Sequence, residues 1–185
     1  MLLKILNIAF KQNELIGIRT YDMEYDEAII GYVLQISDEF FSIRELNENI
    51  IWTGKRIIYF DEVMEVFFKD IYQEGLKILL DKMDTIKTDL QISVKARGKR
   101  LSTHLNQLLN KNEITTFYFI DEHYTTGILE KMDDDYLYIR NIGSGGNEDG
   151  WSCCRIKDLT GFRHNGVEEQ RIKILYDFYK NQNIR

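Results

Sequence analysis

The sequence lacks the features that would place it in a membrane or in an oxidising compartment. Its apolar runs fall short of the roughly eighteen residues that a membrane span needs. The apolar N-terminus shows neither the positively charged region nor the small-residue cleavage site of a secretory signal. The only cysteines, Cys153 and Cys154, are adjacent, and neighbouring strand residues point to opposite faces, so no disulfide within the chain is expected. These absences predict a reduced, cytoplasmic protein that does not enter a membrane.

Proline is missing altogether, and positive charge is in deficit. Lys and Arg number 24 against 30 Asp and Glu, which gives a net charge of -6. A chain of that sign is repelled on average by phosphate backbones, so nucleic-acid binding would need a local basic patch. The one basic cluster is Lys95, Arg97, Lys99 and Arg100. It is the candidate nucleic-acid contact, although a solvated helix face is the favoured interpretation.

Residue patterns that carry catalysis or bind metals are also scarce. His104, His123 and His164 show no ligand spacing, and residues 133–135, three aspartates, fit a hairpin tip better than a calcium loop. The glycine-rich residues 143–150 lack the following helix of a phosphate loop. A cysteine activated by Arg155 is conceivable, but small apolar strand residues are the favoured interpretation. We therefore expect no enzyme activity, no metal and no cofactor.

A fourteen-residue stretch occurs twice, at residues 31–44 and 127–140. Each copy has a glycine, an apolar strand, an acidic turn centred on Asp38 or Asp134, and a second strand that ends in arginine. The copies lie 96 positions apart, and the same offset holds without gaps over residues 31–83 and 127–179, in which 9 of 53 residues are identical. A constant offset of this kind predicts an internal duplication.

The first half of the chain reads as helix, five strands and helix. Helix formers at residues 1–10 precede alternating apolar and β-branched segments, and Asp70 with Gln73 has the spacing of a capping box at the start of the second helix. The expected strands are residues 15–21, 28–37, 40–46, 51–60 and 63–68, with a bulge at Thr53-Gly54.

The second half repeats this order. A leucine stripe on residues 101–109 predicts a helix, and Asn165 with Glu168 has capping spacing before the last helix. The expected strands are residues 114–120, the hairpin 127–140, 151–156 and 159–162. Residues 85–100 keep helical spacing and are expected to form a helical connector between a first unit, 1–84, and a second, 101–185.

This pattern resembles the Sm-like fold, an SH3-like open barrel. The family's strand-two signature is matched by Gly31, Val33, Ile36 and Asp38, and again by Gly127, Leu129, Met132 and Asp133 or Asp134. The resemblance implies a mainly β protein with flanking helices (α+β), built from two tandem five-stranded barrels. Family members that bind RNA carry an asparagine where this chain has Phe41 and Leu137, so the RNA function is not implied.

The expected function is that of a non-enzymatic binding protein with a protein partner. The alternative is binding of RNA or single-stranded nucleic acid through the aromatic strand faces and the basic connector. Because two barrels share one chain, we expect a monomer or a homodimer, not a ring. The repeated arginines are expected to form structural ion pairs with aspartates that both units retain, Arg44 with Asp81 and Arg140 with Asp177.

Overall fold

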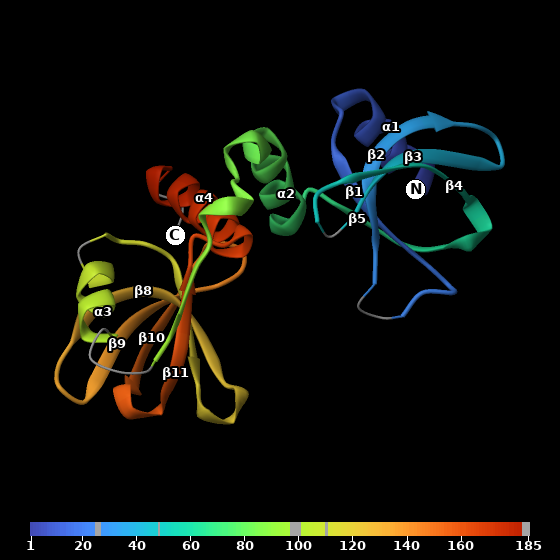
Figure 1. Cartoon of the computed structure of the whole chain (residues 1–185). Helices are drawn as coiled ribbons and strands as arrows, with labels where there is room; N and C mark the ends of the chain where they lie inside the picture. The colour runs from blue at the N-terminus through green and yellow to red at the C-terminus, as the bar shows by residue number, and fades with distance from the viewer. Residues whose placement is uncertain (25–26, 48, 97–100, 110, 183–185) are drawn as a thin grey trace. The chain divides into compact units, whose positions relative to one another are not determined.

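The computed structural model describes residues 1–24, 27–47, 49–96, 101–109 and 111–182 (Figure 1). The chain divides into two compact units, Met1–Leu80 and Asp81–Arg185. Each contains one antiparallel sheet with accompanying helices, so the predicted mainly β, α+β class is confirmed. No helix among the described residues combines the length and the apolar character needed to span a membrane.

The first unit is built on a five-stranded sheet with the strand order β4-β3-β2-β1-β5. Helix α1 (Leu2–Gln12) comes first and helix α2 (Ile71–Lys82) follows the sheet. The strands are β1 (Leu15–Thr20), β2 (Ile29–Ile36), β3 (Phe40–Leu46), β4 (Trp52–Tyr59) and β5 (Val63–Phe68). A 3-10 turn at Phe60–Glu62 joins β4 to β5.

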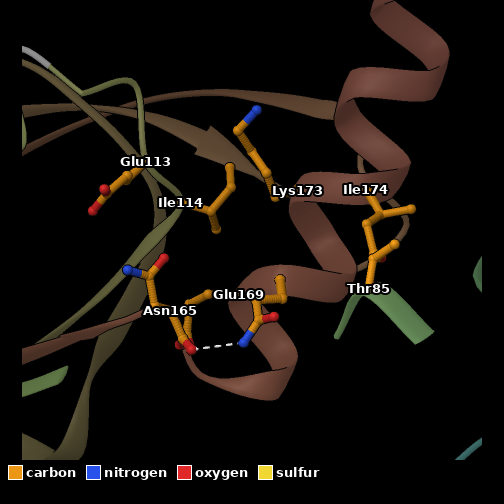
Figure 2. A pocket seen from close by; sticks show the side chains of 8 residues that line it. Thr85, Glu113, Ile114, Asn165, Glu169, Lys173 and Ile174 are labelled. Carbon is orange, nitrogen blue, oxygen red and sulfur yellow. Dashed lines mark hydrogen bonds between the residues drawn. The ribbon is translucent and has the colours of Figure 1, made fainter. Parts of the chain in front are cut away.

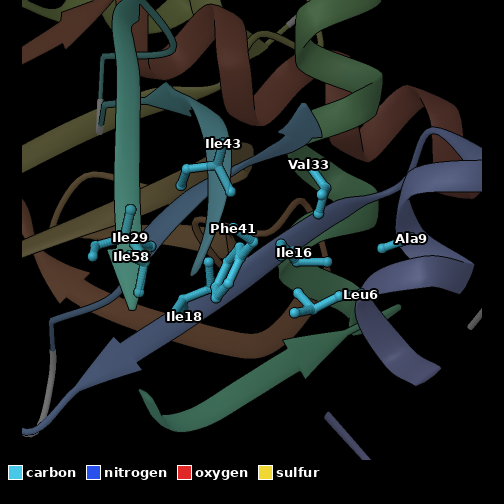
Figure 3. Packing of buried hydrophobic residues seen from close by; sticks show 9 residues of the cluster. All are labelled: Leu6, Ala9, Ile16, Ile18, Ile29, Val33, Phe41, Ile43 and Ile58. Carbon is cyan, nitrogen blue, oxygen red and sulfur yellow. The ribbon is translucent and has the colours of Figure 1, made fainter. Parts of the chain in front are cut away.

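The core of this unit lies between α1 and one face of the sheet. Leu6 and Ala9 of α1 pack on side chains that alternate along the strands, among them Phe41, Ile43 and Ile58 (Figure 3). Successive strand residues point to opposite faces, so Phe41 and Ile43, two positions apart on β3, both enter this core. The helix predicted at residues 1–10 is therefore confirmed, and its apolar side is what covers the sheet.

The second unit has six strands, in the order β10-β9-β8-β7-β11-β6. Helix α3 (Leu101–Leu109) covers the core face with Leu105 and Leu108, and α4 (Val167–Asn181) packs on the other face through Ile172 and Tyr176. The strands are β6 (Ile92–Lys95), β7 (Thr115–Phe119), β8 (Tyr124–Met132), β9 (Tyr136–Ile142), β10 (Glu148–Arg155) and β11 (Leu159–His164).

The two sheets share their pairing registers. Strands β3, β4 and β5 correspond to β9, β10 and β11 at the offset of 96 that the sequence shows. The bulge between β2 and β3 falls at Leu34, and its counterpart between β8 and β9 falls at Glu130, at the same offset. Before β2 the offset becomes 99, as from Leu6 to Leu105, because the loop between the first two strands is three residues shorter in the second unit.

The connector does not form the predicted helix. Its described part contains 3-10 turns at Met83–Thr85 and Thr88–Leu90 and then β6, which pairs with β11. Leu90 ends a 3-10 turn whereas Val94 lies on β6, so their four-residue spacing does not reflect a helix. The backbone groups along the edge of β11 need hydrogen-bond partners, and this segment supplies them as a strand.

One of the two predicted helix caps is correct. The Asp70 carboxylate accepts a bond from the Gln73 amide at 2.8 Å, and the Gln73 side chain accepts one from the Asp70 amide at 3.3 Å. The cap predicted at Asn165 is wrong. Its backbone has a φ of 57°, and α4 begins after Gly166, the residue 96 positions beyond Asp70.

Neither sheet closes into a barrel among the described residues. In the first unit β4 and β5 are the two ends of the strand order, and in the second unit β10 and β6 are.

The bulge predicted at Thr53-Gly54 is present, since Glu45 pairs with Gly54 and Leu46 with Trp52, which leaves Thr53 unpaired in the β3–β4 register.

The glycine at the start of each repeat is required by close backbone approach. A Cβ on Gly31 would lie 2.3 Å from the carbonyl oxygen of Arg44, and one on Gly127 would lie 2.1 Å from that of Arg140. Neighbouring strands would have to separate to admit a methyl group.

We predict that Gly127→Ala or Gly31→Ala lowers the free energy of unfolding of its unit by about 3 kcal/mol. Gly150→Ala is the matched control: a Cβ there meets nothing within 4 Å, and its φ of 72° should cost only about 1 kcal/mol. Each unit has one tryptophan, Trp52 or Trp151, so urea unfolding followed by fluorescence with the other replaced by Phe reports each unit separately. Equal unfolding midpoints for Gly127→Ala and Gly150→Ala would contradict the prediction.

Candidate functional site

The first unit carries an aromatic surface on the sheet face opposite the α1 core. Phe41 and Ile43 point into the core, so Phe40 and Arg44, one residue away from each, point to the other face. We define the aromatic face as Tyr32, Phe40, Arg44, Trp52, Ile57 and Tyr59.

Ring contacts organise this face into two clusters. The Arg44 guanidinium lies 4.3 Å from the centre of the Trp52 ring, and the Tyr32 ring lies 5.6 Å from the same ring. The Phe40 and Tyr59 rings are 6.0 Å apart and meet edge to face. Ile57 and Tyr59 remain 51 % and 48 % exposed. The face therefore offers apolar and aromatic contact area next to a cation, a combination that is enriched at interfaces.

The equivalent arginine of the second unit has different partners. Arg140 forms ion pairs with Glu130 at 2.6 Å and Glu148 at 2.8 Å, and it donates to the Tyr176 hydroxyl at 2.9 Å. Burial disfavours its charge, but the interactions with Tyr176, Glu130 and Glu148 more than compensate, so the pKa of Arg140 is raised. This network attaches α4 to the sheet.

The contact predicted between Arg140 and Asp177 is not one that the structure has. Asp177 receives Lys173, one helical turn away, at 2.6 Å, whereas Arg140 contacts Glu130 and Glu148. Arg44 lies over the Trp52 ring, and its pairing with Asp81, which belongs to the second compact unit, stays a prediction. Retention of both residues in both units therefore did not identify the partners of Arg140, because the two arginines are held in different ways.

Of the candidate nucleic-acid contacts, only Lys95 can be placed. It is the last residue of β6, is exposed and lies opposite Gly161. Arg97, Lys99 and Arg100 lie outside the described residues, so the basic cluster stays a prediction. The helix expected to carry Lys95 is a strand instead.

A buried polar network beneath α4 was missed by the sequence reasoning. Glu169 is 1 % exposed, and one of its oxygens accepts from Thr116 at 2.6 Å and from Arg163 at 2.9 Å. Next to it, His164 Nδ1 lies 2.8 Å from a carboxylate oxygen of Glu113. The pKa of Arg163 is raised, because the hydrogen bond and charge of Glu169 outweigh the burial of the guanidinium.

Comparison of the two units is the signal that could have revealed this network. At the counterparts of Thr116, Arg163, His164 and Glu169 the first unit has Gly17, Phe67, Phe68 and Gln73. The same place is thus uncharged in one unit and charged in the other. The charges are paired with one another, so the network holds α4 on the sheet.

A cavity of about 220 Å³ opens beside this network (Figure 2). Glu113, Asn165, Glu169 and Lys173 line it, with Ile114 and Ile174 as its apolar part. The described residues contain no group of three or more His, Cys, Asp or Glu placed to hold a metal ion. The cavity thus combines carboxylates and one ammonium without a nucleophile activated by a base.

The two cysteines of β10 face different surroundings. Cys153 is exposed, whereas Cys154 is half-buried and packs against the core of its unit. Burial, followed by the neighbouring Cys153, raises the pKa of the Cys154 thiol. The interpretation of Cys154 as a small apolar strand residue agrees with this packing.

Comparison of the chain with protein-family models, curated proteins and solved structures finds no match.

We predict that Arg140→Ala lowers the free energy of unfolding by about 2 kcal/mol, since it leaves Glu130 without its cation. In a double-mutant cycle, Arg140→Ala and Glu130→Ala should couple by about 1 kcal/mol. Arg140→Ala and Asp177→Ala should be additive, with Lys173→Ala and Asp177→Ala as the control pair, coupled by about 0.5 kcal/mol. Strong coupling between Arg140 and Asp177 would contradict this prediction and support the ion pair that was expected from the sequence.

We also predict that iodoacetamide alkylates Cys153 faster than Cys154 in the native protein, because only a thiolate reacts. The rates are measured on Cys154→Ser and Cys153→Ser variants by mass spectrometry. Alkylation of Cys154 should still accelerate above pH 9, its ordinary pKa. In urea the two rates should converge, and a Cys154 that reacts first in the folded protein would show that the assigned burial is incorrect.

Proposed function

We propose that the chain is a non-enzymatic protein-interaction protein, built from two duplicated units of the Sm-like kind, and that the aromatic face of the first unit is its binding surface. The observation that carries this proposal is the exposure of Ile57 and Tyr59 beside the stacked Arg44 and Trp52. Solvent-exposed aromatic and aliphatic side chains with a nearby arginine are the composition of binding hot spots.

The Sm-like resemblance gains support from the order of elements. In both units a helix precedes five antiparallel strands, and in the first unit the fourth and fifth strands form the two edges. The equal registers and the constant offset support a duplication. Among the described residues neither sheet closes and the second has six strands, so the two five-stranded barrels are part of the proposal.

Difference between the units favours the first as the binding unit. Unit two has Cys153 and Arg155 where unit one has Ile57 and Tyr59, and its Arg140 is engaged by two carboxylates. The second unit keeps aromatic residues on this face, since Trp151 lies opposite Arg140 and is 66 % exposed, but the exposed apolar pair on the fourth strand of the repeat is particular to the first unit.

Binding of RNA or single-stranded nucleic acid is the second candidate. Lys55 lies opposite Arg44 on the aromatic face, so two cations accompany rings on which bases could stack. Against it stand the net charge of -6 and the burial of Phe41 and Leu137, which fill the core where RNA-binding relatives of the Sm-like kind carry an asparagine. We place this candidate below protein binding for those reasons.

The test is affinity capture from lysate with the whole chain as bait, after nuclease treatment. The variant Ile57→Ser/Tyr59→Arg removes the exposed apolar part of the face, and its arginine is the residue that the second unit has at that position. We expect at least one protein retained by the wild type to be lost with this variant. Its purified form should bind the variant at least tenfold more weakly, about 1.4 kcal/mol.

The matched control is Ile120→Ser/Tyr124→Arg, which makes the same chemical changes at residues 52 % and 63 % exposed in the second unit. It should capture the same proteins as the wild type. Identical capture by all three baits would contradict the proposal. Binding of mixed-sequence single-stranded RNA that weakens with salt and is lost in Ile57→Ser/Tyr59→Arg would favour the second candidate instead.

A further inference from the structure

The outer edge of β5 differs from the same edge in the second unit. Strand β5 pairs with β1 on one side, and none of the described residues pairs with its other side. Its counterpart β11 pairs with β7 in the same register, with the same bulge, but its other side pairs with β6. The second unit thus contains a strand in a position that the first unit leaves vacant.

Side-chain burial reflects this difference. Leu159, Phe162 and His164 of β11 are only 5 %, 2 % and 7 % exposed. Their counterparts Val63, Val66 and Phe68 of β5 are all half-buried. An apolar edge strand has therefore been left partly open to solvent in the first unit.

Two of the other three sheet edges carry several of the charges that usually prevent strand addition, and the third, the short β6, carries only Lys95. Strand β4 has Lys55 and Arg56 at its centre, and β10 has acidic residues at its start and Arg155 at its end. Strand β5 (VMEVFF) has Glu65 alone, which is already paired with Arg19 at 2.8 Å. Long apolar edges without such protection pair readily with another strand.

We propose that the outer edge of β5 binds an extended segment of a partner protein, added antiparallel as a sixth strand, whose sequence follows the pattern of β6: apolar, any, apolar, basic. This surface is separate from the aromatic face, so it stands or falls independently of the function proposed above. Strand addition of this kind draws its affinity from backbone hydrogen bonds and its specificity from alternate side chains.

The register of β6 on β11 defines where each side chain of the guest strand lies. Ile92 lies opposite His164 and Val94 opposite Phe162, and Val94 packs against the core. In the first unit these places adjoin Phe68 and Val66, which line the core face of their own sheet. The guest side chain at the Val94 place would therefore complete the burial that β5 lacks, and the one at the Ile92 place, which is 46 % exposed in β6, would cover Phe68 in part.

The basic position follows from charge. Lys95 lies opposite Gly161, and the counterpart of Gly161 in β5 is Glu65. A lysine or arginine of the guest would lie across from this carboxylate. The glycine also marks a difference in fit, because a Cβ on Gly161 would lie 2.7 Å from the carbonyl oxygen of Val94. Because Glu65 has a Cβ at this place, the backbone of the guest strand must lie slightly farther from β5 here than β6 lies from β11. An ion pair with Glu65 would replace the close backbone contact.

The experiment uses the whole chain and a labelled peptide with the sequence of residues 89–96, DLQISVKA, followed by fluorescence anisotropy. We expect saturable binding with amide chemical-shift changes concentrated at residues 63–68. A peptide with Val94→Asp should not bind. The protein variant Glu65→Lys should bind the parent peptide about fivefold more weakly, and a peptide with Lys95→Glu should restore its binding.

The remaining outcomes overturn the proposal. Shift changes confined to β11 would show that the peptide only displaces β6. If neither Glu65→Lys in the protein nor Lys95→Glu in the peptide changed the affinity, the register assigned to the guest strand would be wrong. A doubled mass in light scattering that Glu65→Lys abolishes would assign the edge to a second copy of this chain. Failure of the aromatic-face variants to alter capture has no bearing on these measurements, because none of the residues changed there lies on β5.

Discussion

Pairing of the last strand of each unit with the strand that opens the five-stranded repeat, β1 with β5 and β7 with β11, is the interaction on which the rest of the structure depends. Ile16 lies opposite Phe68 in the first unit, and Thr115 lies opposite His164 in the second. This long-range pairing brings the closing helix back to the opening strand, where Lys77 of α2 donates to Glu14 at 2.6 Å. That hydrogen bond raises the pKa of Lys77. It also leaves the fifth strand with one side free of the sheet, so the outer edge of β5 or β11 is a consequence of the topology.

The two units differ in what lies along this outer strand edge. In the second, residues that precede α3 form β6 and cover β11, and Gly161 allows the close approach. In the first, β5 ends the strand order. A similar divergence occurs under the closing helix, where Gln73 and Phe67 in one unit become Glu169 and Arg163 in the other. The two units share their backbone fold, so the fold does not explain these differences in side chains and edge pairing. The differences instead concern what each unit contacts.

The two repeated arginines differ in whether their charge is used within the unit or is available to a partner. Arg140 is only 17 % exposed and engaged by Glu130 and Glu148, so it belongs to the packing of α4. Arg44 lies over Trp52 on a face that keeps Ile57 and Tyr59 accessible. The arginine that both units retain is thus used for packing in one and presented beside exposed apolar side chains in the other.

The sequence by itself determined the features that depend on neighbours along the chain. Alternating apolar residues located β3 to its end residues, the Asp70–Gln73 spacing identified the start of α2, and the repeated motif predicted equal registers 96 positions apart. Only the tertiary structure decided the partners. Lys95 is on a strand because β11 offers backbone groups for pairing, and Arg140 contacts Glu130 because their strands are neighbours in the sheet. Glu169 is buried because α4 packs where Thr116 and Arg163 of two paired strands donate to its carboxylate. Local propensity acts between residues a few positions apart, whereas edge pairing and ion pairing depend on which segments the fold brings side by side.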